Sequence, residues 1–200
     1  MSIIIVASSP YHNFDQYIYN KDDILIGLED GCYEIIKRNL PLDIAVSDFD
    51  TTKYLDIIKD KAIKFIKYPT KKDQIDLELA LMYAKEYYPN ECIHIFNALY
   101  GRMDHELITI KLLYKYPNII LHSDEEELFI VEDYYKIPNN TEFSIINFEN
   151  VELEIQNAEY SLSKRMVDKN DCYTSCNRSF DNTFIKIYSG KVILVVKKEK

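Results

Sequence analysis

Residues 68–78 read Tyr-Pro-Thr-Lys-Lys-Asp-Gln-Ile-Asp-Leu-Glu, and this stretch joins a loop to a helix. Pro69 disfavours helical backbone at the residue before it, so the stretch begins as a loop. Apolar residues then recur at helical spacing and predict a helix over 74–87. They are Leu77, Ala80, Leu81 and Ala84. Asp73 and Asp76 are three residues apart, so both lie on one side of the helix start.

Lys72 stands beside these two acids, and the combination has two interpretations. One is an ordinary helix start, because the helix dipole favours acidic side chains there. The other is a place where a divalent cation meets a phosphate group, since carboxylates bind the cation and an ammonium group binds the phosphate. Further acidic clusters along the chain favour the second interpretation.

The composition is that of an acidic globular protein, with 200 residues, 47% apolar and 28% charged residues, and a formal net charge of -9. This length allows one large domain or two small ones. Sequence-independent nucleic-acid binding needs a Lys/Arg surface, whereas clustered carboxylates suit divalent cations. No stretch approaches the roughly 18 apolar residues of a membrane span. We therefore expect neither a nucleic-acid nor a membrane partner.

The chain opens with an apolar run over 3–7. No basic residue precedes this run, and it is too short for a signal peptide. We therefore expect a cytoplasmic protein. Four cysteines fit reduced thiols in such a compartment: Cys32, Cys92, Cys172 and Cys176. The last two are spaced loosely like metal ligands, but no second pair stands near them, so structural zinc is not expected.

The first 120 residues alternate between strand-like and helix-like segments. Strands are expected at 3–7, 24–28, 44–46, 62–66, 92–96 and 119–122. Helices are expected at 32–39, 53–59, 74–87 and 104–114. Such alternation is typical of parallel strands joined by crossover helices, so the predicted fold class is α/β.

After residue 123 the helical pattern gives way to short strand-like segments separated by turn residues. They are expected at 128–132, 142–148, 151–155, 160–162, 183–188 and 192–196. This pattern predicts a small antiparallel sandwich or barrel. We expect an N-terminal parallel-sheet α/β domain over residues 1–123 and a C-terminal antiparallel β-sandwich domain over residues 128–200.

Acidic residues follow the expected strands of the first domain. Asp30 follows one strand, Asp48 and Asp50 follow the next, and Asp104 lies beyond the strand that ends at Phe96. Ligands of parallel α/β sheets bind outside the carboxyl ends of the strands. If the segment is extended, Asp48 and Asp50 point the same way, which suits Mg²⁺. The alternative is an acidic turn.

The segment 97–105, Asn-Ala-Leu-Tyr-Gly-Arg-Met-Asp-His, is expected to turn from a strand into a helix. Gly101 would let the backbone approach a phosphate, and Arg102 would donate hydrogen bonds to phosphate oxygens. Asp104 could instead cap the helix, and a histidine such as His105 is more often structural than catalytic. The chain has neither a Walker loop nor a Gly-x-Gly-x-x-Gly pattern, so the common nucleotide-binding folds are not indicated.

Four blocks, in order, resemble the thiamine pyrophosphokinase (thiamin diphosphokinase) family. Its members carry Asp-Gly-Gly, Gly-Asp-x-Asp-Ser, Lys-Asp-x-Thr-Asp-x-Glu and Gly-Gly-Arg-x-Asp-His. The matching blocks are 30–32 (Asp-Gly-Cys), 47–51 (Ser-Asp-Phe-Asp-Thr), 72–78 (Lys-Asp-Gln-Ile-Asp-Leu-Glu) and 100–105 (Tyr-Gly-Arg-Met-Asp-His). Every charged position survives, while uncharged positions depart from the pattern, among them Cys32, Ser47, Ile75 and Tyr100.

The family also ends in a β-sandwich domain with a Ser-Asn-Glu-like turn, which residues 176–178 (Cys-Asn-Arg) resemble. The resemblance implies transfer of a diphosphoryl group from ATP to the hydroxyl of thiamine, giving thiamine diphosphate and AMP. It implies that four acids hold Mg²⁺ on the ATP phosphates and take part in catalysis with Arg102: Asp48, Asp50, Asp73 and Asp76.

Further ATP contacts are implied for Asp30, Lys72, Gly101, Arg102, Asp104 and His105. Cys176 and Asn177 would line the thiamine pocket. Family members are homodimers in which thiamine lies where the sandwich of one subunit meets the α/β domain of the other. Two alternative functions would use the same residues. One is that of a catalytically degenerate thiamine- or nucleotide-binding protein, and the other is that of a Mg²⁺-dependent nucleotide hydrolase.

Overall fold

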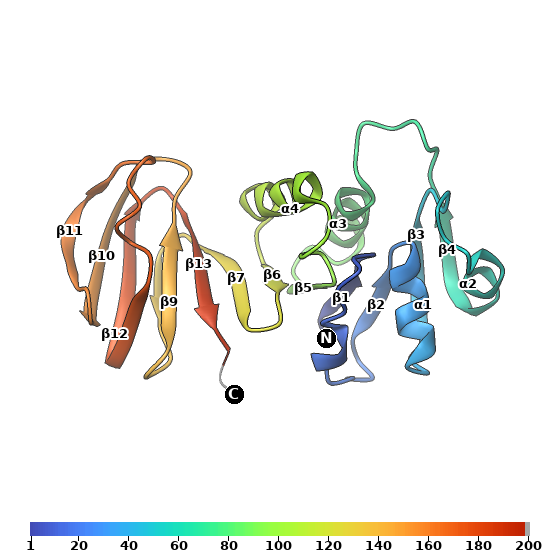
Figure 1. Ribbon diagram of the computed structural model, residues 1–200, viewed down its shortest axis with the longest axis horizontal. Helices are drawn as coiled ribbons and strands as arrows, with labels where there is room; N and C mark the ends of the chain where they lie inside the picture. Colours follow the sequence, from blue (N-terminus) through green and yellow to red (C-terminus); the bar gives the residue numbers. More distant parts are fainter. Residues whose placement is uncertain (199–200) are drawn as a thin grey trace. The chain divides into compact units, whose positions relative to one another are not determined.

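The computed structural model describes residues 1–198 and divides the chain into two compact units, one of residues 1–124 and one that begins at Glu125 (Figure 1). The first unit alternates strands and helices. Its strands are β1 (Ile3–Val6), β2 (Ile24–Gly27), β3 (Leu42–Ser47), β4 (Ala62–Lys67), β5 (Ile93–Phe96) and β6 (Ile119–His122). Its helices are η1 (Phe14–Gln16), α1 (Asp30–Lys37), α2 (Leu55–Lys61), α3 (Asp76–Tyr87) and α4 (Met103–Lys115).

All strand pairs of the first unit are parallel, in the order β6-β5-β1-β2-β3-β4. In the centre, Ile3 of β1 is in register with Ile24 of β2 on one side and Ile93 of β5 on the other. The chain fills one side of β1 with β2, β3 and β4, and then returns to its other side with β5 and β6. Every residue of β1 is buried, as expected for a central parallel strand covered on both faces.

The turn from β2 into α1 depends on a close approach between backbones. A Cβ atom added at Gly31 would overlap the carbonyl oxygen of Val6 and lie 2.7 Å from that of Ala7. Glycine therefore lets the first turn of α1 lie directly against the end of β1. Helix α1 packs on β1, β2 and β3, where Cys32 and Ile35 are fully buried.

The second unit consists of antiparallel strands. They are β7 (Glu126–Val131), β8 (Tyr134–Lys136), β9 (Glu142–Ile146), β10 (Val151–Ala158), β11 (Leu162–Val167), β12 (Asn177–Ser189) and β13 (Val192–Lys197). β13 pairs with β7 and β9, while β10 pairs with β11 and β12. Both groups of strands bury side chains in one core, to which Phe143 and Leu194 contribute from one group and Leu153 and Ile185 from the other.

The prediction of an α/β fold is confirmed, and the helix bounds differ from the predicted ones by at most two residues. The second unit contains larger differences. The strand predicted over 183–188 begins at Asn177 in the structure. The prediction missed its first part because the buried positions there are the polar Asn177 and Ser179, while the apolar Phe180 is exposed. The predicted strand over 160–162 lies at Leu162–Val167, and β8 was not predicted. The alternation of apolar and polar residues therefore does not predict a strand whose buried positions are occupied by hydrogen-bonded polar residues.

Among residues 1–198, none of the helices combines the length and the apolar character needed to cross a membrane. All four cysteines are free thiols: Cys32, Cys92, Cys172 and Cys176. Burial raises the pKa of the Cys32 thiol well above its usual range, so this thiol remains protonated and packs as a small apolar side chain.

The close approach at Gly31 yields a stability prediction. Gly31→Ala is expected to lower the free energy of unfolding by about 2–3 kcal/mol or more, because the new methyl group must push α1 away from β1. Gly101→Ala is the matched control, since a Cβ there meets its nearest neighbours at 3.4 Å. Urea unfolding measures both variants, and equal stability of the two would contradict the packing argument.

Candidate active site

A cleft of about 660 Å³ opens at the carboxyl ends of the parallel strands in the first unit. Its lining includes one residue that follows each of four strands: Ser8 after β1, Glu29 after β2, Asp48 after β3 and Asn97 after β5. The strand order reverses between β1 and β5, and ligands of open parallel sheets bind at such switch points. The fold therefore brings loops from distant parts of the sequence to one site.

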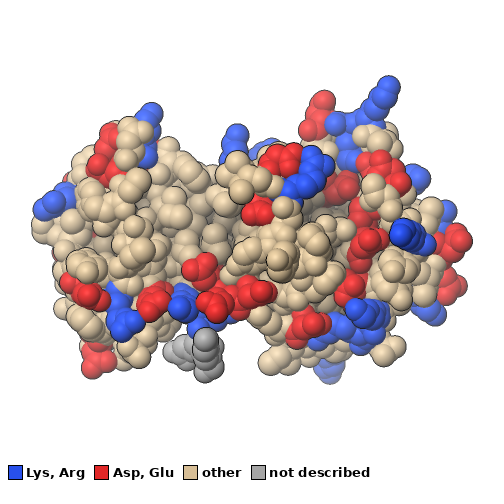
Figure 2. Space-filling model, viewed as in Figure 1, with Lys and Arg blue, Asp and Glu red and all other residues tan. Residues whose placement is uncertain are grey.

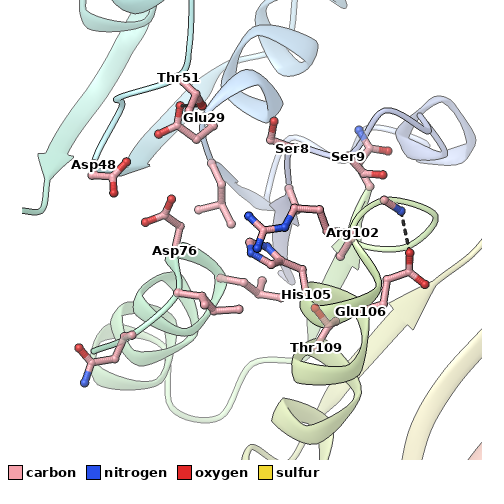
Figure 3. Close-up of a pocket in the computed structure, with 18 of the residues that line it drawn as sticks. Ser8, Ser9, Glu29, Asp48, Thr51, Asp76, Arg102, His105, Glu106 and Thr109 are labelled. Carbon is pink, nitrogen blue, oxygen red and sulfur yellow. Dashed lines mark hydrogen bonds between the residues drawn. The ribbon is translucent and has the colours of Figure 1, made fainter. Parts of the chain in front are cut away.

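One side of the cleft is acidic. Figure 3 shows Glu29, Asp48 and Asp76 on this side, across the cleft from Arg102 and His105. Carboxylate oxygens of Glu29, Asp48 and Asp50 lie within 4.8 Å of one another. Oxygen atoms at this spacing can reach one divalent cation after small side-chain rotations.

Lys72 lies between two of these acids. Its ammonium nitrogen is 2.5 Å from Asp48 Oδ2 and 3.0 Å from Asp76 Oδ1, and the Lys72 and Asp48 side chains are only 12% and 11% exposed. Burial raises the pKa of Asp48, but the hydrogen bond and charge of Lys72 outweigh burial, so the pKa lies below its ordinary value. Burial lowers the pKa of Lys72, and the two carboxylates reverse that shift, so its pKa is raised. Both groups are therefore charged at neutral pH.

The acidic side carries an excess of negative charge. Four carboxylates line it and one ammonium group offsets them: Glu29, Asp48, Asp50 and Asp76 with Lys72. Figure 2 shows acidic and basic side chains interspersed over the face in view, and the chain as a whole carries a formal net charge of -9. The excess of carboxylates at the cleft favours a cation there.

Ser47 connects two of the acids from below the cleft. Its hydroxyl contacts Glu29 Oε1 and lies 2.7 Å from Asp76 Oδ2. Thr51 donates a hydrogen bond of 3.1 Å to Glu29 Oε2. Ser47 is fully buried and ends β3, so the strand itself fixes the position of this hydroxyl.

The opposite side of the cleft is formed by the loop that enters α4. Arg102 donates hydrogen bonds through Nε and Nη2 to Asp104, at 3.1 and 2.6 Å, and its side chain is 71% exposed. This guanidinium lowers the pKa of the Asp104 carboxyl. The backbone N–H of Gly101 donates to Glu106 at 2.7 Å, which closes the turn (Figure 3). The arrangement presents an exposed, pre-oriented guanidinium at the cleft.

Asn97 holds the two loops of the switch point together. Its Oδ1 accepts hydrogen bonds from the backbone N–H groups of Asn13 and Phe14, at 2.8 and 2.9 Å. Its own N–H donates to Asn13 Oδ1 at 2.7 Å. The residue has a φ of 54°, a left-handed conformation that asparagine tolerates better than most residues. Its Nδ2 is buried and has no hydrogen-bond partner among the described residues.

Seven of the residues predicted for the ATP and metal site line the cleft: Asp48, Asp50, Lys72, Asp76, Gly101, Arg102 and His105. Three others lie exposed outside its lining: Asp30, Asp73 and Asp104. Asp30 accepts a hydrogen bond of 2.6 Å from Thr52, and Asp104 orients Arg102. Their predicted contacts with ATP or metal remain predictions.

The predicted thiamine residues lie in the second unit. Cys176 and Asn177 line a cavity of about 330 Å³ whose charged lining consists of three acidic and two basic residues: Glu126, Glu142, Glu159, Arg178 and Lys197. Asn177 is buried, accepts hydrogen bonds from the N–H groups of Tyr160 and Arg178, and donates to the carbonyl of Tyr160. It therefore shapes the turn from within.

Sequence reasoning missed Glu29, Thr51 and Glu106 as cleft residues. The argument that placed Asp30 at the site applies equally to Glu29, since Glu29 directly follows the same predicted strand, over 24–28. The backbone of Glu29 has a φ of 46°, so the chain turns sharply there and Glu29 enters the cleft while Asp30 stays outside. No sequence pattern predicts this turn, because glutamate rarely adopts a positive φ.

Comparison with known proteins matches residues 15–123, more than half of the chain, to the family model of the thiamin pyrophosphokinase catalytic domain. A curated relative is the thiamine pyrophosphokinase of Bacillus subtilis (strain 168), 35% identical over 118 residues. That alignment covers 57% of this chain and 55% of the relative, so it spans about half the length of each.

Solved structures extend the likeness over the full chain. The crystal structure of thiamine pyrophosphokinase from Bacillus subtilis has a TM-score of 0.86 and 26% identity, with 100% of both chains covered. A thiamin pyrophosphokinase family protein from Enterococcus faecalis reaches 0.83 at 23% identity, again over both full chains. Thiamin pyrophosphokinase from Candida albicans reaches 0.76 at 14% identity, covering 99% of this chain and 89% of that one. The last two likenesses concern the fold alone.

The ion pairs of Lys72 yield a pH-dependent prediction. In metal-free buffer at pH 7, Lys72→Met is expected to lower the free energy of unfolding by about 1–3 kcal/mol, since it leaves two largely buried carboxylates without their cation. Because the folded pKa of Asp48 is depressed, its contribution is present above about 3.9, the unfolded value, and is lost as the pH falls through the folded pKa. The penalty should therefore shrink near pH 3.

Urea unfolding at pH 7 and pH 3 checks this expectation. Lys71→Met is the matched control, because Lys71 is exposed and forms no ion pair with another described residue. A Lys72→Met penalty that stays the same at both pH values would show that its cause is not the ion pair.

Proposed function

The chain belongs to the thiamin pyrophosphokinase family, and from this premise we propose that it transfers a diphosphoryl group from ATP to the hydroxyl of thiamine. The products are thiamine diphosphate and AMP. The observation that carries the proposal is the cleft, in which Asp48 and Asp76 face Arg102 across the carboxyl ends of parallel strands. A cation site and cationic side chains that bind the phosphates are recurring parts of phosphoryl-transfer sites.

The residues of the acidic side fit a divalent cation. Asp76 Oδ1 is buried, and the contact that it makes among residues 1–198 is the ion pair with the ammonium of Lys72, at 3.0 Å. Carboxylate oxygens are the ligands that Mg²⁺ prefers. We assign Asp48, Asp50 and Asp76 as its holders, and bound Mg²⁺ would neutralise charge on the ATP phosphates. Asp73 is left out of this set because it is exposed outside the cleft lining.

Lys72 and Arg102 have distinct parts in binding the phosphates. Lys72 is a compact charge already held among the acids, so it is poised to move onto a phosphate oxygen when a cation replaces it. Arg102 offers the donors that Asp104 does not occupy, and Asp104 keeps the guanidinium oriented. His105, in the first turn of α4, lines the cleft beside Arg102. These cations stabilise the negative charge that spreads over the transferred group.

The proposal divides the chain into two domains. Residues 1–123 would be the catalytic domain, and residues 128–200 would be a β-sandwich domain that binds thiamine. The cavity lined by Cys176 and Asn177 is also lined by Glu126, Glu142 and Glu159 and by two basic residues, Arg178 and Lys197, which both pair with Glu142. Thiamine carries a cationic ring, and the acid proposed to face it is Glu159, with which neither basic residue pairs. In the proposed homodimer, this cavity of one subunit completes the active site of the other. The four free thiols support a reducing, cytoplasmic location.

Product analysis tests the proposed activity. Wild-type protein incubated with ATP, Mg²⁺ and thiamine should release thiamine diphosphate and AMP in equal amounts. Asp48→Asn should lower kcat at least about a hundredfold, because a lost cation ligand removes transition-state stabilisation, while circular dichroism should show that the variant still folds. ATP breakdown without thiamine would indicate a hydrolase, and thiamine binding without AMP would indicate a binding protein.

Subunit mixing tests the shared site. Asp76→Asn disables the cleft, and Glu159→Lys places a positive charge in the cavity proposed for a cation. Glu159 is suitable because it is exposed and its side chain has no partner among the described residues, whereas replacing Asn177 would also break the turn. Each variant alone should be nearly inactive.

After exchange at equal concentrations, half of the dimers should be mixed and each should hold one intact site. The mixture is therefore expected to recover about a quarter of wild-type activity. A mixture no more active than its two components, or a fully active monomer in sedimentation, would rule out the shared site.

A further inference from the structure

The loop between β3 and α2 runs beside the start of α1. Thr51 of this loop donates a hydrogen bond of 3.1 Å to Glu29, and Figure 3 shows the two residues side by side. The next residue, Thr52, donates a hydrogen bond of 2.6 Å to Asp30 Oδ1. Each acceptor lies 22 residues before its donor, so the two segments run in the same direction, residue for residue.

A pair of stacked tyrosines continues this contact. The rings of Tyr33 and Tyr54 have centroids 3.7 Å apart and planes inclined by only 5°. Tyr33 lies in α1, and Tyr54 directly precedes α2. Stacked rings contribute more than the area that they bury, so the tyrosines add to the hydrogen bonds. We call these three contacts the clamp: Thr51–Glu29, Thr52–Asp30 and Tyr54–Tyr33.

The hydroxyl of Thr52 connects the parts of the clamp. It donates to Asp30 and accepts a hydrogen bond of 3.2 Å from the backbone N–H of Tyr54. A hydroxyl has one proton and two lone pairs, so both bonds form at once. Asp30 is the fixed end of this chain of bonds, because it belongs to α1, which packs on β1, β2 and β3.

The segment held by the clamp begins next to Asp50. This residue lines the cleft, and its carboxylate belongs to a group of acidic oxygens within 4.8 Å of one another. Its neighbour Asp48 is buried and paired with Lys72, whereas Asp50 is exposed on the loop. The place of Asp50 therefore depends on how firmly the loop is held.

We propose that Asp30 is a positioning residue for Asp50. Through the hydroxyl of Thr52 it holds the loop after β3 against α1, and the stacked tyrosines support the same segment. The inference rests on the proposed function, in which Asp50 is a holder of the cation. Asp30 thus acts as a hydrogen-bond acceptor outside the cleft lining, which differs from the ATP contact that the resemblance implies.

Two replacements of Asp30 separate these roles. Asp30→Asn keeps an oxygen that accepts from Thr52 but loses the negative charge, whereas Asp30→Ala loses both. Asp30→Ala should lower kcat about three- to tenfold, because the loop that carries Asp50 loses a hydrogen bond, and should leave the KM for thiamine unchanged. Asp30→Asn should keep at least about half of the wild-type kcat, because the contact survives.

Tryptic cleavage after Lys53 provides a readout that does not depend on activity. Lys53 is exposed and lies between two residues of the clamp, Thr52 and Tyr54. Cleavage requires the loop to leave its contacts, so Asp30→Ala should be cut there about three- to tenfold faster than wild type. Asp30→Asn should be cut near the wild-type rate. Mass spectrometry of the full chain identifies the cut by the fragments 1–53 and 54–200.

Asp56→Ala is the matched control. Like Asp30, Asp56 is an exposed acid in the first turn of a helix, but it lies in α2 and outside the clamp. The change therefore removes the same charge from the same kind of position. It should alter neither kcat nor the rate of cleavage after Lys53.

Thr52→Val removes the other half of the contact at nearly constant shape. It should match Asp30→Ala in both readouts, and the double variant should be no worse than either single variant, because both changes break one bond. Fully additive losses would show that Asp30 and Thr52 act separately. If Asp30→Ala fails to fold by circular dichroism, Thr52→Val takes its place, with rescue by Thr52→Ser, which keeps the hydroxyl.

Two further results overturn the proposal. One is cleavage after Lys53 that is no faster in Asp30→Ala than in wild type. The other is an Asp30→Asn variant that loses as much kcat as Asp30→Ala, since the charge would then be what matters. The proposed function fails separately, when wild type forms no thiamine diphosphate. The cleavage rates then still decide whether Asp30 holds the loop.

Discussion

The parallel pairing of β1 with β2 on one side and with β5 on the other is the constraint on which the site depends. It forces the loops after these strands to leave the sheet at the same edge. The glycine at position 31 permits α1 to begin against the end of β1, and Asn97 ties the loop after β5 to the loop after β1. Residues far apart in the chain thereby face one cleft.

Concentrating carboxylates at one edge has an electrostatic cost, and the structure shows how it is limited. Lys72 bridges Asp48 and Asp76, and the buried hydroxyl of Ser47 approaches two acids at once. These contacts stabilise the acids only in part, since one ammonium faces four carboxylates. This concentration of negative charge suits the cation and the phosphates of the proposed function.

Sequence periodicity was sufficient for the strands and α-helices of the first unit, because parallel strands and their covering helices bury apolar side chains at regular intervals, but it did not predict the short helix η1. It was insufficient in the second unit. There Asn177, Ser179 and Thr183 occupy buried positions of β12 and are held by hydrogen bonds, while Phe180 is exposed. A pattern of hydrophobicity cannot detect a strand whose inner face is polar.

The sequence by itself determined the α/β alternation, the family, and the placing of Asp48, Asp50 and Asp76 at strand ends and a helix start. Only the tertiary structure decided which acids meet. It turned Glu29 into the cleft and left Asp30 outside, and it set Ser47 against Asp76, 29 residues away. The physical reason is that local propensities describe a residue and its neighbours, whereas contacts across the cleft follow from strand register and backbone turns.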